Sequence, residues 1–149
     1  MMSKQLISAL LLSAMTSFAF ANDITGLWQT IDDKTGEAKG QIEIRQEANG
    51  TYVGKIVKIT PRPGYTLRTT CVGCPAPYTN KPILGLDILT GLKHSEGNNY
   101  TKGRILDPNT GKVYSMKAKL SSNGNRLTLR GYVGVSALGR TQIWLRESK

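Results

Sequence analysis

The two cysteines of the chain are the residues whose spacing most directly suggests chemistry. Cys71 and Cys74 stand three positions apart in a stretch rich in proline and glycine. A pair at this spacing can form a local disulfide, act as a redox dithiol, or supply two of the four ligands of a zinc site. We expect the disulfide, because a redox pair usually lies at a helix N-terminus and because His94 is the only histidine that could add a zinc ligand.

Little else in the sequence is suited to catalysis. Asp87 stands in an apolar run, and a carboxyl group buried there would have its pKa raised by desolvation unless a cation paired with it. The alternative is that Asp87 is a strand-end residue, and His94 is expected in an exposed loop. The sequence contains no Gly-x-Ser-x-Gly motif, phosphate-binding loop or histidine-rich metal motif. We therefore expect no catalytic residues, and we predict no cofactor or metal.

The first 21 residues are expected to be absent from the working protein. After a lysine near the start, an uncharged and mostly apolar run extends from Leu6 to Phe20. It ends in Ala19-Phe20-Ala21, the small-x-small pattern of a signal-peptidase site. This pattern predicts cleavage between Ala21 and Asn22, with a single domain over 22–149 that is periplasmic or secreted. No second apolar stretch approaches the roughly 20 residues of a transmembrane helix.

The chain is basic, with 20 Lys and Arg against 10 Asp and Glu. Only Lys4 of these lies in the first 21 residues, so the net charge of the remaining domain is about +9. A basic surface favours anionic partners, such as an anionic surface of the cell envelope. The charges are spread along the chain, however, and in 112–119 they alternate with other residues as on the solvent face of a strand. This spread and the expected export argue against nucleic-acid binding, for which clustered charge is typical.

Alternating apolar and polar residues dominate the rest of the sequence and predict strands. In one such run Tyr114 and Met116 fall on the same face and lysines on the other, and Leu127 and Leu129 share a face of the next run. The run 82–93 is apolar almost throughout and fits either a strand buried on both faces or a short helix; its two glycines favour the strand. The predicted strands are 24–31, 41–46, 51–59, 82–93, 99–106, 112–121, 126–133 and 139–146.

Eight strands joined mostly by tight turns predict an all-β fold, a single eight-stranded up-and-down antiparallel barrel. Closure removes the exposed edges that an open sheet leaves in solvent. The interior of such a barrel is either filled by side chains or holds one small ligand. The alternative is a two-sheet sandwich, which requires long crossovers, and only the connection 60–82 is long enough to be one.

The two ends of the domain resemble those of lipocalin and calycin barrels. Gly26-Leu27-Trp28 resembles the Gly-x-Trp signature that opens these barrels, and the closing run 139–146 contains Arg140 and Arg146. The resemblance implies that the tryptophan plugs one end of the barrel and that an arginine of the last strand packs across it. A planar guanidinium group stacks well on an indole ring.

Further segments carry a closer resemblance, which covers nearly all of the domain. Besides Gly26-Leu27-Trp28, they are the runs from Lys81 to Leu89, Gly103 to Tyr114, Leu129 to Gly134 and Gly139 to Trp144. Through them the chain resembles the DUF2147 family of small exported bacterial proteins. The resemblance implies a lipocalin-like barrel but little about activity, because the family is named as a domain of unknown function.

These observations favour an exported barrel that binds one small hydrophobic or amphipathic molecule without catalysis. One alternative is a basic protein with a side-chain-filled barrel that contacts an anionic component of the cell envelope. Another is a redox or stress protein that acts through its cysteines. An arginine facing the interior could hold a ligand carboxylate by a bidentate contact. The candidate ligand-binding residues of the barrel interior are Trp28, Tyr114, Met116, Leu127, Leu129, Arg140 and Arg146.

Overall fold

The computed structural model describes residues 23–148, which form eight strands and one short 3-10 helix. The expected signal sequence over 1–21 and its cleavage site lie outside the described residues. No helix within residues 23–148 is long and apolar enough to cross a membrane. The elements are β1 (Gly26–Ile31), β2 (Ala38–Gln46), β3 (Tyr52–Ile59), β4 (Asp87–His94), β5 (Asn99–Leu106), β6 (Val113–Leu120), β7 (Arg126–Tyr132), η1 (Ser136–Leu138) and β8 (Arg140–Arg146).

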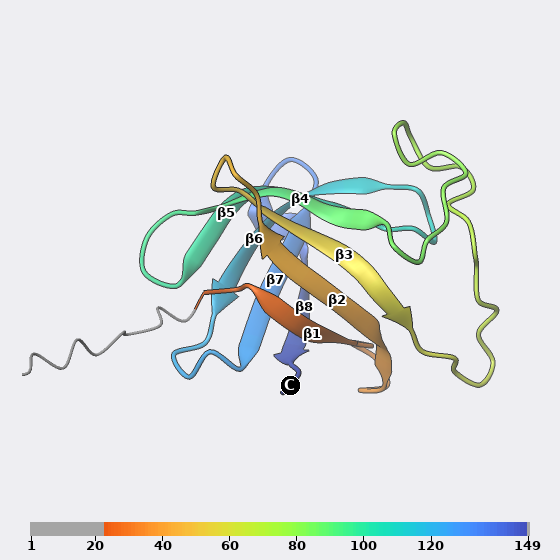
Figure 1. Cartoon of the computed structure of the whole chain (residues 1–149), viewed down its shortest axis with the longest axis horizontal. Helices are drawn as coiled ribbons and strands as arrows, with labels where there is room; N and C mark the ends of the chain where they lie inside the picture. The colour runs from red at the N-terminus through yellow and green to blue at the C-terminus, as the bar shows by residue number, and fades with distance from the viewer. Residues whose placement is uncertain (1–22, 149) are drawn as a thin grey trace, which may run out of the picture.

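Each strand pairs in antiparallel fashion with the next, and β8 returns to pair with β1. The closing ladder places Trp28 opposite Arg146 and Thr30 opposite Trp144. The strands therefore form one closed wall, which can be followed from β1 to β8 in Figure 1. This arrangement confirms the up-and-down barrel and excludes the sandwich, because one continuous ladder joins all eight strands.

The side chains of the strands alternate between core and solvent, as their sequence pattern predicts. On β6, Met116 and Ala118 are buried while Lys117 is exposed, and on β7 Leu127 and Leu129 are buried. Removing apolar surface from water stabilises a fold by about 25 cal/mol per Å². The shared core of these inward side chains is therefore what holds the strands in a closed ring.

Strand β4 begins at Asp87, later than the apolar run 82–93 suggests. Ile83 and Leu86 are buried but belong to a turn, in which the Leu86 N–H donates to the Ile83 carbonyl at 3.1 Å. Gly85 in this turn has a φ of 89°, a left-handed conformation that glycine adopts without steric cost. The apolar run is thus a turn with two buried side chains followed by a strand, and neither one long strand nor a short helix.

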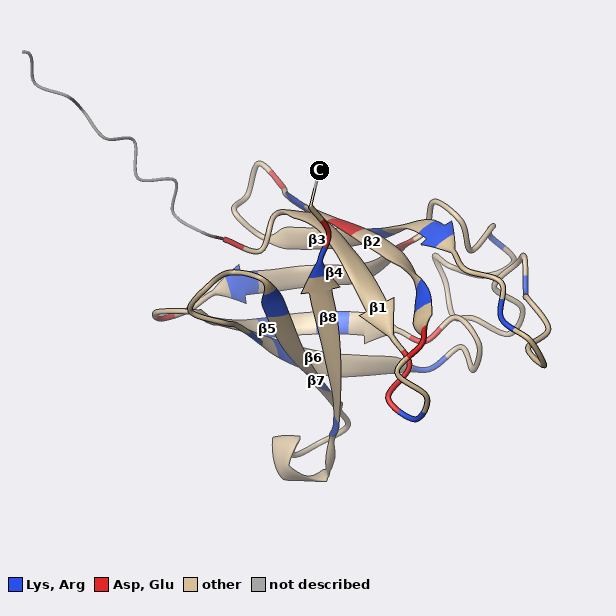
Figure 2. Ribbon diagram, turned by 90° about the horizontal axis from the view of Figure 1, so that it is seen from below, with Lys and Arg blue, Asp and Glu red and all other residues tan. Residues whose placement is uncertain are grey.

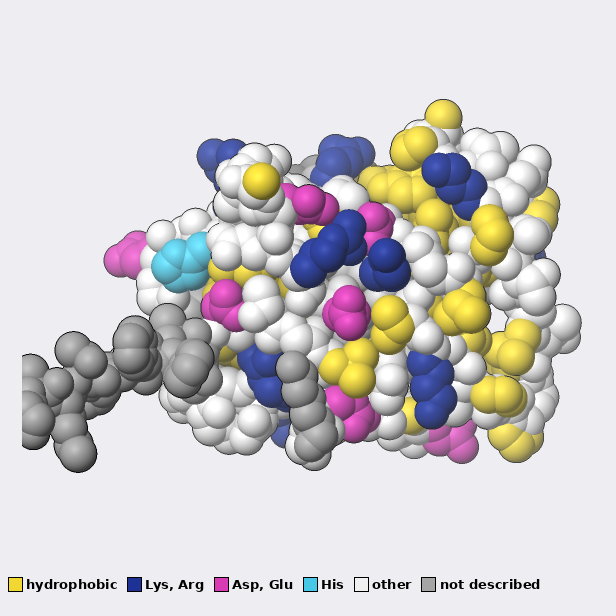
Figure 3. Space-filling view, in the orientation of Figure 1, with side chains coloured by type: hydrophobic (Ala, Val, Ile, Leu, Met, Phe, Trp, Pro, Cys, Tyr) yellow, Lys and Arg dark blue, Asp and Glu magenta, His cyan; other side chains and the backbone are white. Residues whose placement is uncertain are grey.

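The long connection between β3 and β4 carries the cysteine pair. Cys71 and Cys74 form a disulfide with their Cα atoms 5.5 Å apart, which confirms the local disulfide and leaves neither sulfur as a thiolate for zinc. The disulfide loop packs closely on the β5–β6 turn, where a Cβ on Gly111 would lie 2.5 Å from the Gly73 carbonyl oxygen. Exposed hydrophobic side chains of this connection gather at the right of Figure 3.

The barrel has two different ends. In an up-and-down barrel, alternate connections lie at the same end. The loop after β1 carries the acids Asp32 and Asp33, red in Figure 2. They form ion pairs with Arg62 of the β3–β4 connection and with Arg140 of β8. Lysines and arginines in the same view are spread over several strands and loops. We call the end surrounded by the loops 32–37, 60–86, 107–112 and 133–139 the open end, and the opposite one the closed end.

Candidate ligand cavity

A cavity of about 750 Å³ occupies the open half of the barrel. All eight strands contribute to its wall, and segments within 32–34, 60–68 and 107–109 surround its mouth. Pockets that hold small molecules usually have volumes of about 300–1,000 Å³. A barrel filled throughout by side chains, as in the envelope-contact alternative, therefore does not describe this half of the interior.

One wall of the cavity is apolar. Ile88, Ile105, Met116 and Leu129 come from the consecutive strands β4 to β7, and isoleucines of β2 and β3 extend this surface. They face inward because side chains alternate along each strand, and three of the four are buried. This wall offers a hydrophobic surface to an aliphatic or aromatic part of a ligand.

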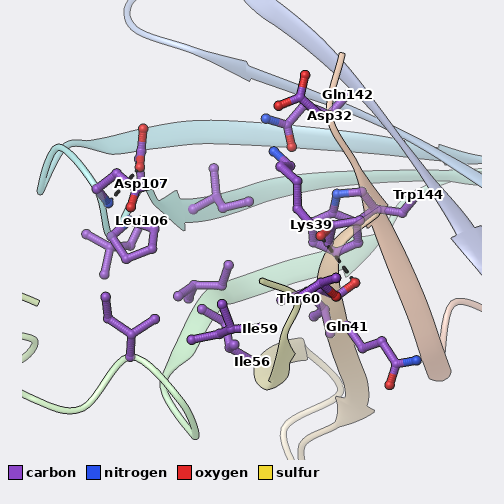
Figure 4. A pocket seen from close by; sticks show the side chains of 18 of the residues that line it. Asp32, Lys39, Gln41, Ile56, Ile59, Thr60, Leu106, Asp107, Gln142 and Trp144 are labelled. Carbon is purple, nitrogen blue, oxygen red and sulfur yellow. Dashed lines mark hydrogen bonds between the residues drawn. The ribbon is translucent and has the colours of Figure 1, made fainter. Parts of the chain in front are cut away.

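The opposite wall carries polar side chains from β1, β2 and β8, which are neighbours in the closed barrel. Thr30, Lys39, Gln41, Gln142 and Trp144 line the cavity on this side. Figure 4 shows Lys39, Gln142 and Trp144 projecting into the same part of the cavity. A bound molecule would thus meet hydrogen-bonding groups on one side and apolar groups on the other.

Lys39 reaches the cavity through a β-bulge in β2. Thr30 pairs with Gly40 while Ile31 pairs with Ala38, so Lys39 is an extra residue without a partner on β1. A bulge re-aims a side chain relative to the regular alternation, and bulges are frequent at the rims of barrels. Lys39 takes part in none of the salt bridges formed within residues 23–148.

Trp144 is the deepest residue of β8 in the cavity wall. Its side chain is 2% exposed, and its indole Nε1–H has no hydrogen-bond partner within residues 23–148. Buried polar groups are usually hydrogen-bonded, since leaving one without a partner costs about 1–3 kcal/mol. Figure 4 shows the ring and its nitrogen at the cavity surface. The indole N–H is thus a buried donor that meets the cavity instead of a protein acceptor.

Ion pairs surround the mouth. Asp32 lies 2.8 Å from Arg62, and Asp33 lies 2.7 Å from Arg140. The hydrogen bond from the Arg62 guanidinium holds the pKa of the Asp32 carboxyl group well below its usual range. The same guanidinium stacks on Tyr65 with 3.9 Å to the ring centre. Arg140 is 69% exposed and engaged by Asp33, so it lies at the rim of the cavity and not inside the barrel.

The closed end is sealed by Trp28 and Arg146. Trp28 is fully buried, and its Nε1–H donates to the Ile24 carbonyl at 2.9 Å. The Arg146 guanidinium lies 4.4 Å from the centre of the Trp28 ring, as the lipocalin resemblance implies. Gly26 leaves room for this arginine, because a Cβ there would lie 2.9 Å from it. The guanidinium also donates to the backbone carbonyls of Asp23, Thr25 and Gly124 at 2.6 to 2.7 Å.

The candidate residues from the sequence divide between these two ends. Those that line the cavity are Tyr114, Met116, Leu129 and Arg140. Those packed at the closed end, outside the cavity wall, are Trp28, Leu127 and Arg146. No direct contact with a molecule in this cavity is therefore expected for these three residues. The Trp28 N–H donates to the Ile24 carbonyl, and the Arg146 guanidinium stacks on the Trp28 ring and donates to backbone carbonyls. Leu127 is completely enclosed by the core.

Sequence reasoning did not single out the polar wall. The alternation over 139–146 places Gln142 and Trp144 on the same face as Arg140, so a signal for their inward orientation is present in the sequence. Lys39 gives no such signal. It precedes the predicted strand 41–46, and a bulge arises from how two strands pair.

The acid and the histidine considered for catalysis lie outside the cavity wall. Asp87 is half-buried at the start of β4 and accepts two hydrogen bonds of 2.9 Å from Arg45. The Arg45 guanidinium lowers the pKa of the Asp87 carboxyl group, so Asp87 is a paired strand-end residue and not a buried acid with a raised pKa. His94 ends β4 and is exposed, with its Nε2 2.7 Å from the Gly97 carbonyl oxygen.

Comparisons with known proteins bear on the fold and the family. Among solved structures, the barrel is similar to protein HP1028 from the human pathogen Helicobacter pylori, which is described as belonging to the lipocalin family. The two share 21% identity with a TM-score of 0.70, over 85% of this chain and 84% of that chain. This likeness shows a lipocalin-like fold. No curated protein matches the chain.

A family model described as "Uncharacterized protein conserved in bacteria (DUF2147)" matches residues 26–146. The match begins with the first residue of β1 and ends with the last residue of β8. It therefore includes the whole barrel, the cavity wall and the Trp28–Arg146 pair at the closed end. By this match the chain belongs to the DUF2147 family.

Proposed function

We propose that this protein is an exported binding barrel that takes one small hydrophobic or amphipathic molecule. The observation that carries the proposal is the cavity of about 750 Å³ that opens at one end of the barrel. Its lining combines an apolar wall with a few polar groups, which is the usual composition of small-molecule sites. Burial of a ligand's apolar surface at about 25 cal/mol per Å² supplies affinity without any covalent step.

The closed half of the barrel favours the same function. Trp28 and Arg146 seal that end, so a molecule would enter and leave through the open end. The rival proposal, a solid barrel that acts only through its outer surface, gives no role to a cavity of this size.

We also propose that the protein works after export, in an oxidising compartment. The apolar N-terminal run with its Ala19-Phe20-Ala21 ending supports export, and the Cys71–Cys74 disulfide suits such a compartment. Intact-mass measurement of the protein from the periplasm of an exporting bacterium tests this directly. The expected mass is that of a chain starting at Asn22, and a mass including residues 1–21 contradicts the proposal.

A fluorescent hydrophobic probe, N-phenyl-1-naphthylamine, tests the binding function. We expect the wild-type protein to bind one probe molecule, with increased probe emission. Leu129→Trp adds bulk to the cavity wall and is expected to weaken binding about tenfold or more, because overfilling leaves the ligand no room. Thr128→Trp is the matched control, since Thr128 is the neighbouring residue and faces outward.

The outcome of this titration decides between the two uses of the barrel. Both variants are first compared with the wild type by thermal unfolding, so that loss of binding is not confused with loss of the fold. If the wild type fails to bind the probe, or if Leu129→Trp binds it as tightly as Thr128→Trp, the cavity is not a ligand site.

A further inference from the structure

The buried indole N–H of Trp144 points to one kind of ligand group. A donor with 2% of its side chain exposed and no partner within residues 23–148 carries a desolvation penalty in the folded protein. A ligand that places an acceptor oxygen on this N–H removes that penalty. A purely hydrocarbon ligand does not, because it would cover the donor without bonding to it.

Lys39 indicates the charge of the acceptor. The bulge in β2 brings this lysine to the same part of the cavity as Trp144. Two acids at the mouth are paired, Asp32 with Arg62 and Asp33 with Arg140, and a third, Asp107, accepts the Asn109 backbone N–H at 2.9 Å. The ammonium group of Lys39 is therefore a cation at the cavity with no salt-bridge partner within the described chain.

The apolar wall of the cavity indicates the chemistry of the rest of the ligand. The polar groups come from β1, β2 and β8, whereas Ile88, Ile105, Met116 and Leu129 come from β4 to β7 on the other side of the ring. A molecule that satisfies both walls has an anionic oxygen group at one end and an apolar body. The separation of the walls thus favours an amphipathic molecule over one that is polar or apolar throughout.

We propose that the cavity selects an amphipathic anion, whose carboxylate-type group is held by the Trp144 indole N–H and the Lys39 ammonium while its apolar body packs against the isoleucine-rich wall. This inference rests on the proposed binding function and deepens it by naming the ligand class. It also moves the anion-binding role from the arginines considered in the sequence to the tryptophan and the lysine. Arg140 is held at the rim by Asp33, and Arg146 is held at the closed end by backbone carbonyls.

Three probes that share one tail test the selection. Dodecanoate, dodecan-1-ol and dodecyltrimethylammonium differ in the charge and hydrogen-bonding capacity of the head group. We expect isothermal titration calorimetry to show dodecanoate binding about tenfold more tightly than either of the others, since a hydrogen bond to a charged group is worth about one to two powers of ten in affinity.

Two substitutions locate the head group. Trp144→Phe removes the N–H and keeps an aromatic ring, and Lys39→Met removes the charge and keeps much of the chain length. Each is expected to weaken dodecanoate binding about tenfold and to weaken dodecan-1-ol binding less, because a neutral hydroxyl group accepts a weaker hydrogen bond than a carboxylate does. Lys117→Met is the matched control, because Lys117 is exposed on the outer face of β6 and its loss removes the same charge from the protein.

The outcomes separate the inference from the function on which it rests. If dodecan-1-ol binds as tightly as dodecanoate, or if Trp144→Phe and Lys39→Met bind dodecanoate like the wild type, the anion selection is wrong while the binding function stands. If Lys117→Met weakens dodecanoate binding as much as Lys39→Met does, the effect belongs to net charge and the assigned site is also wrong. If none of the three probes binds, the inference and the proposed function fall together.

Discussion

The two tryptophans of the barrel occupy opposite ends and are used in opposite ways. Trp28 at the closed end has its N–H bonded to the Ile24 carbonyl and its ring covered by Arg146. Trp144 is almost as deeply buried, but its N–H meets the cavity and finds no acceptor within residues 23–148. A satisfied donor stabilises the fold, whereas an unsatisfied one costs free energy until something binds. The Trp28 N–H therefore contributes to the stability of the closed end, whereas the Trp144 N–H offers a donor to the binding function that we propose for the open end.

The two arginines of β8, Arg140 and Arg146, repeat the same contrast. Arg146 donates to three backbone carbonyls and stacks on Trp28, which ties the chain's first described residues to its last strand. Arg140 makes one exposed ion pair with Asp33 at the rim. Strand β8 thus places one guanidinium group at the exposed rim and another at the closed end. The position along the barrel axis determines how much each arginine contributes to stability.

Substitution of the two arginines is expected to give the largest difference in the free energy of unfolding. Arg146→Met removes three charge-assisted hydrogen bonds and the cover of Trp28, and we expect the free energy of unfolding to fall by about 3 kcal/mol. Arg140→Met removes only an exposed ion pair, so a change within about 0.5 kcal/mol is expected. Urea unfolding of the two variants measures both values, and similar losses for the two would mean that the ends do not differ as described.

Substitution of the two tryptophans is expected to give a smaller difference in the free energy of unfolding. Trp28→Phe leaves the Ile24 carbonyl without its donor and is expected to cost about 1–3 kcal/mol. Trp144→Phe removes a donor that has no protein partner, so the unfolding free energy is expected to change by less than about 0.5 kcal/mol or to rise. The same urea experiment measures both, and a Trp144→Phe variant that loses as much stability as Trp28→Phe contradicts the assignment of the open end.

The Cys71–Cys74 disulfide offers a further test of the difference between the two ends, because it lies in a connection at the open end. A bond between residues three apart closes a small loop, so replacing Cys71 and Cys74 together by alanine is expected to cost about 2 kcal/mol or less. Binding of N-phenyl-1-naphthylamine is expected to persist within about twofold, since neither cysteine lines the cavity. Loss of binding in a variant that stays folded would show that the long connection has a more direct part in the site.

The smallest expected effect is a pH dependence that belongs to the closed end. Burial raises the pKa of Tyr52 to about 12, whereas tyrosine in an unfolded chain has a pKa near about 10. The full contribution of Tyr52 to stability is therefore present below about pH 10, and it is lost as the pH rises toward about 12 because the unfolded state ionises first. Urea midpoints at about pH 9 and about pH 11 are expected to differ less for Tyr52→Phe than for the wild type, and equal differences contradict this cause.

Much of the fold could be predicted from the sequence, because alternation reports which face of a strand is buried. It correctly places Met116 and Leu129 inside and Lys117 outside. Alternation does not report depth along the barrel axis, which is why Leu127 and Leu129 look equivalent in the sequence although only Leu129 lines the cavity.

The candidate site was less predictable, because its key features arise from contacts between distant segments. The orientation of Lys39 depends on a bulge in the pairing of β2 with β1. The different roles of Trp28 and Trp144 depend on which carbonyls lie within reach in the folded barrel. Neither feature leaves a local pattern in the chain. Gly26, by contrast, is part of a recognisable sequence signature, and a glycine is needed there because Arg146, at the other end of the sequence, packs against it.

The two indole N–H groups allow one direct measurement of this account. The chain contains two tryptophans, so a 15N-labelled sample gives two indole signals in a 1H–15N correlation spectrum, and Trp144→Phe assigns them. During titration with dodecanoate, the Trp144 signal is predicted to move to lower field as its N–H gains an acceptor, while the Trp28 signal stays in place. A bound state in which the Trp144 signal does not move, or in which the Trp28 signal moves instead, would contradict the account.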